Sequence, residues 1–342
     1  MEQKQTRQNR GFMKIGKVSQ TVLKRSLLKP LQFKRDDVLI GPSVEEMCYG
    51  IRTGAGQQTL SASVVLYGDE KDLGVFALAQ VANDLATRGA VPVGVNVQIM
   101  LPPYAYESRL KTMIELIEQS GSKLGIQVLS AKAEVCPAIS KAVVSMTGVG
   151  RIEDGALIQS KNGKAGQDIV LLKWIGLEGT FRVMREKEDA LNQRFVPTFL
   201  ERIRALEPQI FSVEALKIAK ESGASAMHQI TSGGVLAALW EFSEASNVGI
   251  EVDLKKMAIR QETIEVCEFC HLNPYQLTSA GSVLIFTENG EALVEQYEKA
   301  EIQAAVIGKT TVDTARILVG GEEKRFLERP AADELLKLYD PN

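Results

Sequence analysis

The chain has 342 residues, of which 45% are hydrophobic and 24% are charged, and its 40 basic and 43 acidic residues give a formal net charge of −3. At roughly 100–200 residues per domain, this length predicts two domains. The composition is typical of a globular protein and excludes collagen-like and disordered classes. The balanced charge offers no electrostatic basis for binding nucleic acid. Only His228 and His271 supply imidazole groups, which excludes zinc hydrolases built on several histidine ligands.

The cellular compartment follows from the cysteines and the N-terminus. Four cysteines in a chain of this length indicate a reducing compartment rather than a disulfide framework. The polar, basic residues 1–12 precede no apolar segment, so they predict a disordered extension and not a secretory signal. No stretch approaches the roughly 18 apolar residues that span a bilayer. We therefore expect a cytoplasmic protein that does not bind membranes.

The first half of the chain alternates between strand and helix patterns. Residues 37–41 and 59–67 are strand-like, and residues 72–88 have apolar side chains at helical spacing. Gly89 is the expected C-cap of that helix. The next segment, 91–101, alternates with period two and predicts a strand. Its expected buried face consists of Val91, Val93, Val95, Val97, Ile99 and Leu101.

The remaining elements divide the chain into two parts. A helix at 106–124 and strands at 126–129 and 142–150 complete the first unit, and the Gly- and Lys-rich segment 151–167 is a candidate linker. The expected domains are 13–155 and 165–320, followed by a C-terminal hairpin strand and helix at 321–342. The second half has expected strands at 168–175 and 304–308, helices at 179–188, 213–222 and 331–338, a glycine-rich turn at 231–234 that begins a helix, and a hairpin at 320–321.

Three fragments resemble known motifs but lack a required part. Gly308-Lys309-Thr310 ends like a P-loop, but Gln303 stands where the first glycine is needed, so a strand is the better interpretation. The 54–56 stretch begins like a dinucleotide fingerprint but lacks the third glycine, which leaves a turn. The 267–271 stretch has the haem-attachment spacing Cys-x-x-Cys-His. Haem attachment requires export, and a structural zinc site would have only weak further ligands, so two half-buried thiols on a helix are expected.

The strongest signal is the polar pair Asn83–Asp84 in the last turns of an apolar helix, followed by Gly89, Ala90 and Pro92. A carboxylate near a helix C-terminus opposes the helix dipole by about 0.3–1 kcal/mol. Its presence therefore suggests a function, whereas a solvated aspartate at a helix end is the structural alternative.

This D-x4-G-A-x-P segment resembles the ATP-binding superfamily of aminoimidazole ribonucleotide (AIR) synthase, selenophosphate synthetase, thiamine monophosphate kinase and the hydrogenase-maturation dehydratase HypE. The resemblance extends from Met13 to about Val319. The stretches 173–180, 233–253 and 260–281 are most similar to HypE-like, AIR-synthase-related proteins.

The resemblance implies an α/β (α+β) fold with two domains, in which the N-terminal domain dimerises through its strands into a barrel. It also implies ATP and Mg²⁺ in the cleft between the domains, where relatives activate a carbonyl or similar oxygen by phosphorylation. The residues that it assigns to the nucleotide are Asn83, Asp84, Gly89, Thr231, Ser232, Gly233 and Gly234.

The sequence departs from the family pattern where several acidic residues are expected. Glu46 matches the glutamate of a Gly-Glu-Asp-Cys-Ala stretch, but Met47 replaces the aspartate. Ser63 replaces the aspartate of a Ser-Thr-Asp stretch. Gln229 and Ser232 replace two acids of a His-Asp-Val-Thr-Glu-Gly-Gly stretch. Each change removes a carboxylate from the implied cation site.

Three carboxylates remain for a cation, namely those of Glu46, Asp84 and Glu134, the last being the surviving acid of a Gly-Gly-His-Thr-Glu stretch. Mg²⁺ prefers hard oxygen ligands, for which neutral Ser or Gln oxygens and the soft thioether of Met47 are poor replacements. The remaining carboxylates predict one cation rather than the usual pair.

The phosphate side of the implied site is better preserved. The turn 231–234 leads into a helix and leaves backbone N–H groups for an anion, although a plain glycine-capped helix start has the same pattern. The last cysteine is Cys270, so the C-terminal thiol on which HypE forms a thiocyanate is missing. No cysteine near residue 20 suggests a selenophosphate synthetase nucleophile either.

Two hypotheses follow. The favoured one is a catalytically degenerate paralogue that binds a nucleotide or a protein partner, as a homodimer or as a heterodimer with a related paralogue. The alternative is an active ATP-dependent enzyme whose rebuilt metal site uses Glu45, Glu46, Asp84 and Glu134.

Overall fold

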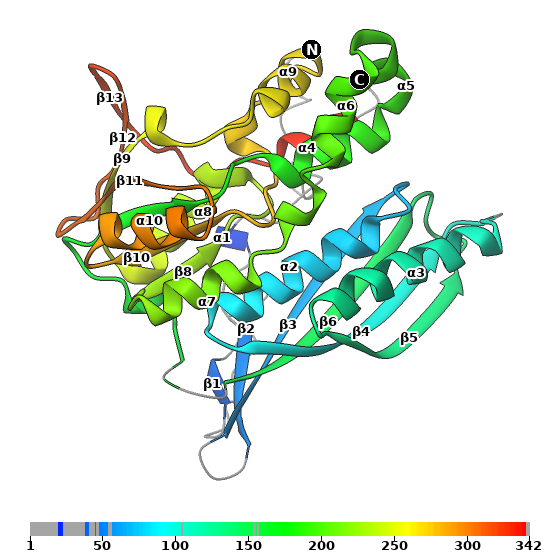
Figure 1. Cartoon of the computed structure of the whole chain (residues 1–342), viewed down its shortest axis with the longest axis horizontal. Helices are drawn as coiled ribbons and strands as arrows, with labels where there is room; N and C mark the ends of the chain where they lie inside the picture. The colour runs from blue at the N-terminus through cyan, green and yellow to red at the C-terminus, as the bar shows by residue number, and fades with distance from the viewer. Residues whose placement is uncertain are drawn as a thin grey trace, which may run out of the picture.

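The structure is a computed structural model that describes residues 20–22, 38–40, 45, 48–53, 57–103, 105–152, 155 and 157–339. The predicted extension at 1–12, Glu46, Met47 and the predicted turn at 54–56 lie outside these residues. The described residues form a mixed α/β protein with two sheets (Figure 1), which confirms the predicted fold class.

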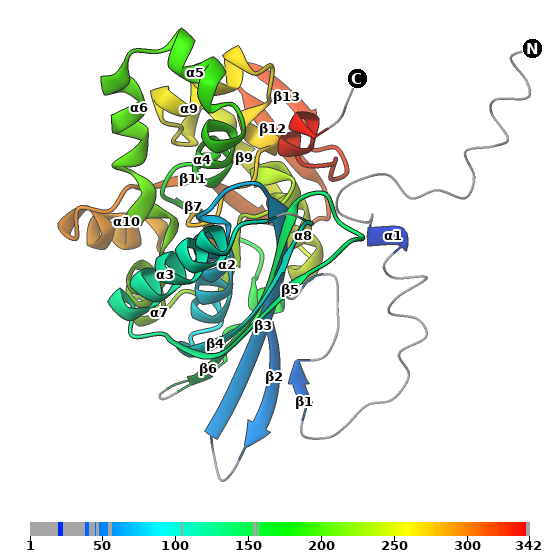
Figure 2. The same cartoon turned by 90° about the vertical axis from the view of Figure 1, so that its right-hand side faces the viewer.

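The first sheet has six strands in the order β1-β2-β3-β6-β4-β5. Its strands are β1 (Val38–Ile40), β2 (Cys48–Thr53), β3 (Gln57–Gly68), β4 (Val91–Leu101), β5 (Gln127–Val135) and β6 (Ala142–Ile152). Only the β4–β5 pair is parallel among these strands. Helices α2 (Leu73–Thr87) and α3 (Glu107–Lys123) lie on one face of this sheet (Figures 1 and 2).

Strand β4 has the predicted bounds, but its predicted buried face is wrong at one end. Val91 is 47% exposed and Val93 is 38% exposed, whereas Val95 is buried. The pairing of β4 with β6 shifts between Pro92 and Gly94. This irregularity adds a residue to β4, so the side chains before it point to the opposite face.

The second sheet has seven strands in the order β13-β12-β9-β11-β7-β10-β8. They are β7 (Asp168–Leu172), β8 (Ala226–Gln229), β9 (Gly249–Asp253), β10 (Val283–Thr287), β11 (Ala304–Thr311), β12 (Arg316–Gly320) and β13 (Glu323–Phe326). Alternate residues of β7 pack into separate cores, Ile169 with α8 (Gly234–Ser246) and Val170 with α7 (Val213–Glu221) and α10 (Gly290–Lys299). Because helices cover both faces of β7, its sequence is apolar at every position from Ile169 to Leu172.

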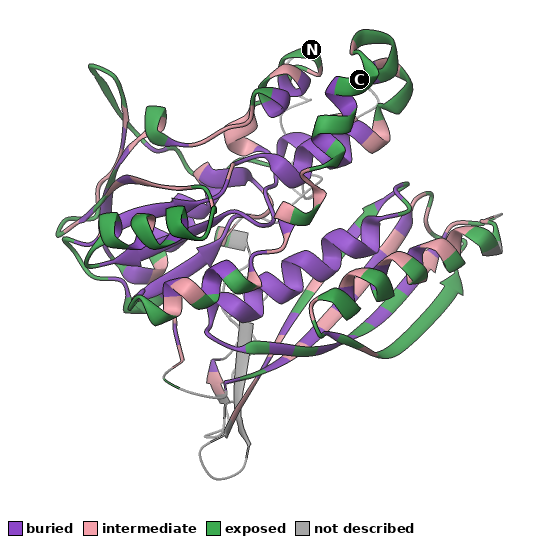
Figure 3. Ribbon diagram, in the orientation of Figure 1, coloured by how far each residue is buried: buried purple, intermediate pink, exposed green. Residues whose placement is uncertain are grey.

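Helix α2 joins the two halves of the molecule. All of its residues are buried, as the purple ribbon in Figure 3 shows. Its core cluster includes the first sheet and also the C-terminal helices α4 (Leu177–Glu186), α6 (Pro197–Arg204) and α9 (Gln261–Phe269). Phe76 of α2 stacks on Phe181 of α4 with ring centroids 6.4 Å apart. One hydrophobic core therefore crosses the boundary between the sheets.

Ion pairs along α4 also cross this boundary. Arg182 Nε lies 3.2 Å from Glu70 Oε1, and Arg185 Nη2 lies 2.8 Å from Asp72 Oδ2. The Arg182–Glu70 pair is buried on both sides. Loss of one partner would leave an uncompensated buried charge, so the pair fixes the orientation of α4 against the first sheet.

Several smaller predictions are also tested. The structure confirms the expected helix around Cys267, which is α9, and the expected hairpin, which β12 and β13 form. It also confirms that Gly308–Thr310 belongs to a strand, β11. The predicted final helix is reduced to the 3₁₀ helix η7 (Glu334–Leu338). The described residues also include a short helix α5 (Glu188–Arg194) and the fragment α1 (Gln20–Val22). Among the described residues, no helix has the length and apolar character to cross a membrane.

The shared core gives a first prediction. Phe181→Ala should lower the free energy of unfolding by about 3–5 kcal/mol, since it removes a fully buried ring. Because the core is shared, circular dichroism and tryptophan fluorescence should report one coincident urea transition in the wild type and in this variant. Val312→Ala, at a site 92% exposed, is the control and should have little effect. Two separate transitions, with only one shifted by Phe181→Ala, would contradict a common core.

Candidate functional site

The candidate site lies where the C-terminal end of α2 meets strand β8. Asn83 is fully buried and makes three hydrogen bonds to the C-terminal half. Its Nδ2 donates to Ile210 O (2.8 Å) and to Gln229 Oε1 (2.9 Å), and its Oδ1 accepts from the backbone N–H of Ser212 (2.8 Å). Asn83 therefore connects α2 to two separate segments of the other domain.

Asp84 is 4% exposed, so the alternative of a solvated aspartate is wrong. Its Oδ1 accepts a hydrogen bond of 2.5 Å from Nε2 of Gln229, which also donates to Gln80 O (3.0 Å). A buried carboxylate requires a donor or a cation because its charge loses the stabilisation of water. Gln229 supplies such a donor from the opposite domain.

The direction of these hydrogen bonds follows from the backbone. The N–H of Ser212 can only donate, so the atom of Asn83 that faces it must be the carbonyl oxygen. The amide nitrogen of Asn83 then donates to Oε1 of Gln229, which directs the Gln229 nitrogen at Asp84. This relay, formed by Ser212 N, Asn83 and Gln229, aims an N–H donor at the carboxylate of Asp84, which the family resemblance assigns to a cation.

Of the other predicted metal ligands, only Glu134 is among the described residues, and it is not brought to Asp84. Glu134 lies on the exposed edge strand β5 and pairs with Met100 of β4, whereas the buried face that packs against α2 carries Val97 and Ile99. Glu134 thus belongs to the outer face of the sheet, and Ser63 lies on that face as well, where its hydroxyl is 2.8 Å from that of Thr147. Among the described residues, no group of three or more His, Cys, Asp or Glu side chains could hold a metal ion.

The glycine turn 231–234 has the local structure that its sequence predicts. Gly233 and Gly234 have φ of +86° and +65°, where side chains are disfavoured, and a Cβ on Gly234 would lie 2.5 Å from Tyr275 O. Helix α8 begins at Gly234. The backbone N–H of Gly233 donates to Oδ2 of Asp333 (2.7 Å), and burial raises the pKa of this carboxyl to about 6.

Gly89 has a structural role beside the site. Its φ of +76° ends the turn after α2, as predicted, and its carbonyl accepts a hydrogen bond of 3.0 Å from Lys220 Nζ. Of the predicted nucleotide residues, Asn83 and Asp84 lie together with Gln229, and Gly233 contacts the C-terminal segment instead.

Sequence reasoning missed several buried charged groups near the domain boundary, among them Glu178 and Lys173. Glu178 is fully buried, and its oxygens accept from Gln80 Nε2 (3.0 Å), Thr278 Oγ1 (2.9 Å) and Ala280 N (2.9 Å). Lys173 donates to Gln209 O and Phe211 O, and burial lowers its pKa to about 7. Lys173 and Glu178 both belong to the 173–180 stretch. The signal in the sequence was an ionisable residue next to an aromatic or small residue, since Lys173 precedes Trp174 and Glu178 precedes Gly179.

The cysteine pair has the character of structural thiols. Cys267 is 1% exposed and Cys270 is partly buried, and burial raises the pKa of both. A raised pKa keeps a thiol protonated and unreactive as a nucleophile or metal ligand. The preferred interpretation, that of thiols on an ordinary helix, agrees with this environment.

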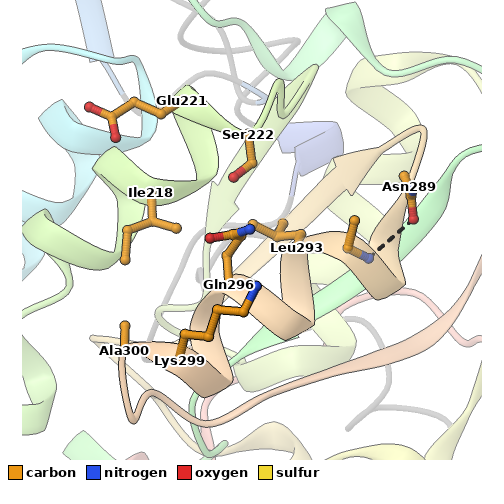
Figure 4. Close-up of a pocket in the computed structure, with 9 residues that line it drawn as sticks. Ile218, Glu221, Ser222, Asn289, Leu293, Gln296, Lys299 and Ala300 are labelled. Carbon is orange, nitrogen blue, oxygen red and sulfur yellow. Dashed lines mark hydrogen bonds between the residues drawn. The ribbon is translucent and has the colours of Figure 1, made fainter.

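Cavities lie on the C-terminal half. One of about 110 Å³ lies beside Gly233 and Ala237 and is also lined by Arg325 and Arg329. A larger groove of about 690 Å³ runs between α7 and α10 (Figure 4). Its mixed lining includes Asn289, which caps α10 through Ala292 N (3.1 Å). The groove has no residue in common with the relay at Asp84.

Comparison with known proteins gives a consistent result. Residues 50–152 match the family model of the AIR synthase related protein, N-terminal domain, and residues 164–320 match that of its C-terminal domain. A putative hydrogenase expression/formation protein of Methanocaldococcus jannaschii is 22% identical over 331 residues, which cover 94% of this chain and 96% of that protein. The carbamoyl dehydratase HypE of Escherichia coli K12 is 24% identical over 277 residues, which cover 78% of this chain and 79% of that protein.

Solved structures show the same fold. A HypE–HypF complex superposes with a TM-score of 0.70 at 18% identity, covering 90% of this chain and 99% of that chain. A hydrogenase maturation protein HypE in complex with ATP superposes with a TM-score of 0.67 at 14% identity, covering 95% and 98%.

The relay gives a second prediction. Asn83→Ala should lower the free energy of unfolding by about 2 kcal/mol or more, because Ile210 O, Ser212 N and Gln229 Oε1 each lose a buried partner. Urea denaturation measures this loss. Asn192→Ala, the same change at an exposed position of α5, is the matched control. Equal stability of the two variants would show that the relay does not stabilise the domain contact.

Proposed function

This chain belongs to the AIR synthase related family, and we propose that it binds a nucleotide between its domains without the magnesium ions that the family resemblance implies. The observation that carries the proposal is the hydrogen bond from Gln229 to Asp84. A HypE relative of the same fold is described as a complex with ATP, which supports a nucleotide as the ligand class.

The charge balance of the site supports a degenerate cation centre. A divalent cation would need several hard oxygen ligands beside Asp84, whereas Gln229 and Asn83, which lie there among the described residues, are neutral amides. A cation next to Asp84 would also have to displace the N–H donor of Gln229. With Gln229 in place, the carboxylate of Asp84 already accepts a hydrogen bond and is less available to a cation. Catalysis that requires two metal ions would therefore be reduced or redirected.

A second candidate function rests on Glu178. This carboxylate and Asp84 are linked through Gln80, whose Nε2 contacts Glu178 and whose carbonyl contacts Gln229. An active ATP-dependent enzyme of the HypE type, which phosphorylates a carbonyl oxygen, could use these two buried acids in place of the missing ones. Mg²⁺-dependent ATP hydrolysis that is lost in Asp84→Asn would favour this candidate.

Thermal-shift measurements with ATP, ADP and AMP provide the third prediction. A ligand at a hundredfold excess over Kd stabilises the folded state by about 2.7 kcal/mol. The wild type should be stabilised equally with Mg²⁺ and with EDTA, since no cation completes the site. Gln229→Asp replaces the donor by a carboxylate and should make the ATP shift depend on Mg²⁺.

Gln296→Asp, the same change at an exposed position of α10, is the control and should retain the wild-type behaviour. A shift that requires Mg²⁺ in the wild type would rule out the metal-independent site. The absence of any shift with all three nucleotides would rule out nucleotide binding.

We also propose that a second copy of the chain, or a related paralogue, covers the outer face of the first sheet. Val65 of β3 is 60% exposed and Val91 of β4 is 47% exposed on the face opposite to α2. Exposed apolar side chains on a sheet favour association. One relative of this fold is described as a HypE–HypF complex, which shows a protein partner for that relative.

Sedimentation velocity tests this surface and gives the fourth prediction. The wild type should sediment as a dimer, and Val65→Asp should shift it toward the monomer because the carboxylate would be buried without a partner. Val312→Asp, at an exposed position of the C-terminal half, should remain dimeric. A wild type that is monomeric at tens of micromolar would refute a homodimer.

A further inference from the structure

The segment after β13 returns across the glycine turn at the start of α8. Asp333 lies in this segment, 100 residues from Gly233 in sequence, and is 6% exposed. Its Oδ2 accepts from the N–H of Gly233 (2.7 Å), and its Oδ1 accepts from the N–H of Leu335 (2.9 Å). Among the described residues, no lysine or arginine forms an ion pair with it. Backbone N–H groups therefore compensate this anion, as they would a phosphate.

Other contacts hold the same segment against both domains. Glu334 Oε2 accepts from Asn273 N (3.0 Å), and Leu335 is buried in the core that contains α2. The ring of Tyr339 lies 5.8 Å from that of Tyr67, at the end of β3. The segment thus spans the domain boundary on the side where the glycine turn is located.

The space beside the turn is also enclosed by this part of the chain. The cavity of about 110 Å³ next to Gly233 has Arg325 and Arg329 in its lining. A second anion at the turn would meet these cationic side chains, but it would also meet Asp333 at hydrogen-bond distance from Gly233. Two anions cannot share one N–H group without strong repulsion.

We propose that residues 331–339 are an internal ligand of the glycine turn, in which Asp333 takes the position of a nucleotide phosphate, so that nucleotide binding and docking of this segment exclude each other. This inference rests on the proposed nucleotide-binding function. A tethered segment acts at an effective concentration on the order of millimolar, so a nucleotide must overcome that competition before it binds. The apparent affinity for the nucleotide then equals the intrinsic affinity multiplied by the fraction of molecules in which the segment is undocked from the turn.

The test compares Asp333→Ala and Asp333→Asn with Asp253→Ala in the full-length protein. Asp253 is a matched control, because its Oδ1 likewise accepts from the backbone N–H two residues later, that of Lys255 (2.9 Å). The first measurement is the rate of trypsin cleavage after Lys337, whose side chain is 60% exposed. Without nucleotide, Asp333→Ala should be cleaved at least fivefold faster than the wild type, and Asp253→Ala should match the wild type. Equal rates for Asp333→Ala and the wild type would overturn the docking role of Asp333.

The second measurement is ATP affinity by titration calorimetry. Asp333→Ala should bind ATP at least tenfold more tightly than the wild type, and saturating ATP should accelerate cleavage after Lys337 in the wild type. Asp333→Asn keeps the acceptor but removes the charge, and should be intermediate in affinity, which guards against a folding defect of the alanine variant. Equal ATP affinity in Asp333→Ala and the wild type overturns this inference alone. No ATP binding in any variant overturns the proposed function together with it.

Discussion

The burial of helix α2 on every side is the constraint on which the rest of the structure depends. A helix that packs on one sheet normally leaves its polar residues to water, but here the C-terminal half covers them. Gln80, Asn83 and Asp84 must therefore find partners across the domain boundary. They find them in Glu178, in the 210–212 backbone and in Gln229. The same contacts that satisfy these groups determine how the two sheets are oriented.

The same constraint bears on the residue at position 229 of β8. Two carboxylates facing each other at positions 84 and 229 would require a cation between them. A glutamine at position 229 instead gives Asp84 a neutral donor and gives Asn83 an acceptor. Gln229 thus forms a connected set of hydrogen bonds with Asn83 and Asp84. These hydrogen bonds hold the end of α2 against β8.

The glycine turn at the start of α8 also has buried polar groups that need partners. Its N–H groups lack partners within the helix, and burial makes such groups costly unless an acceptor is supplied. Asp333 supplies one from the C-terminal segment. Both positions that the family resemblance assigns to a ligand, the carboxylate of Asp84 and the N–H of Gly233, are thus compensated by groups of this chain. A ligand that uses either group would have to compete with an existing hydrogen bond.

The sequence alone determined the features that depend on local pattern: the bounds of β4, the apolar helix that carries Asn83 and Asp84, and the glycine turn before α8. Only the tertiary structure decided which groups meet. A bulge turned Val91 outward, the register of β5 put Glu134 on the face away from α2, and Asp333 reached Gly233 from 100 residues along the chain. Periodicity encodes which face of an element is apolar. The partner of a buried polar group, in contrast, is set by long-range packing, which no local spacing records.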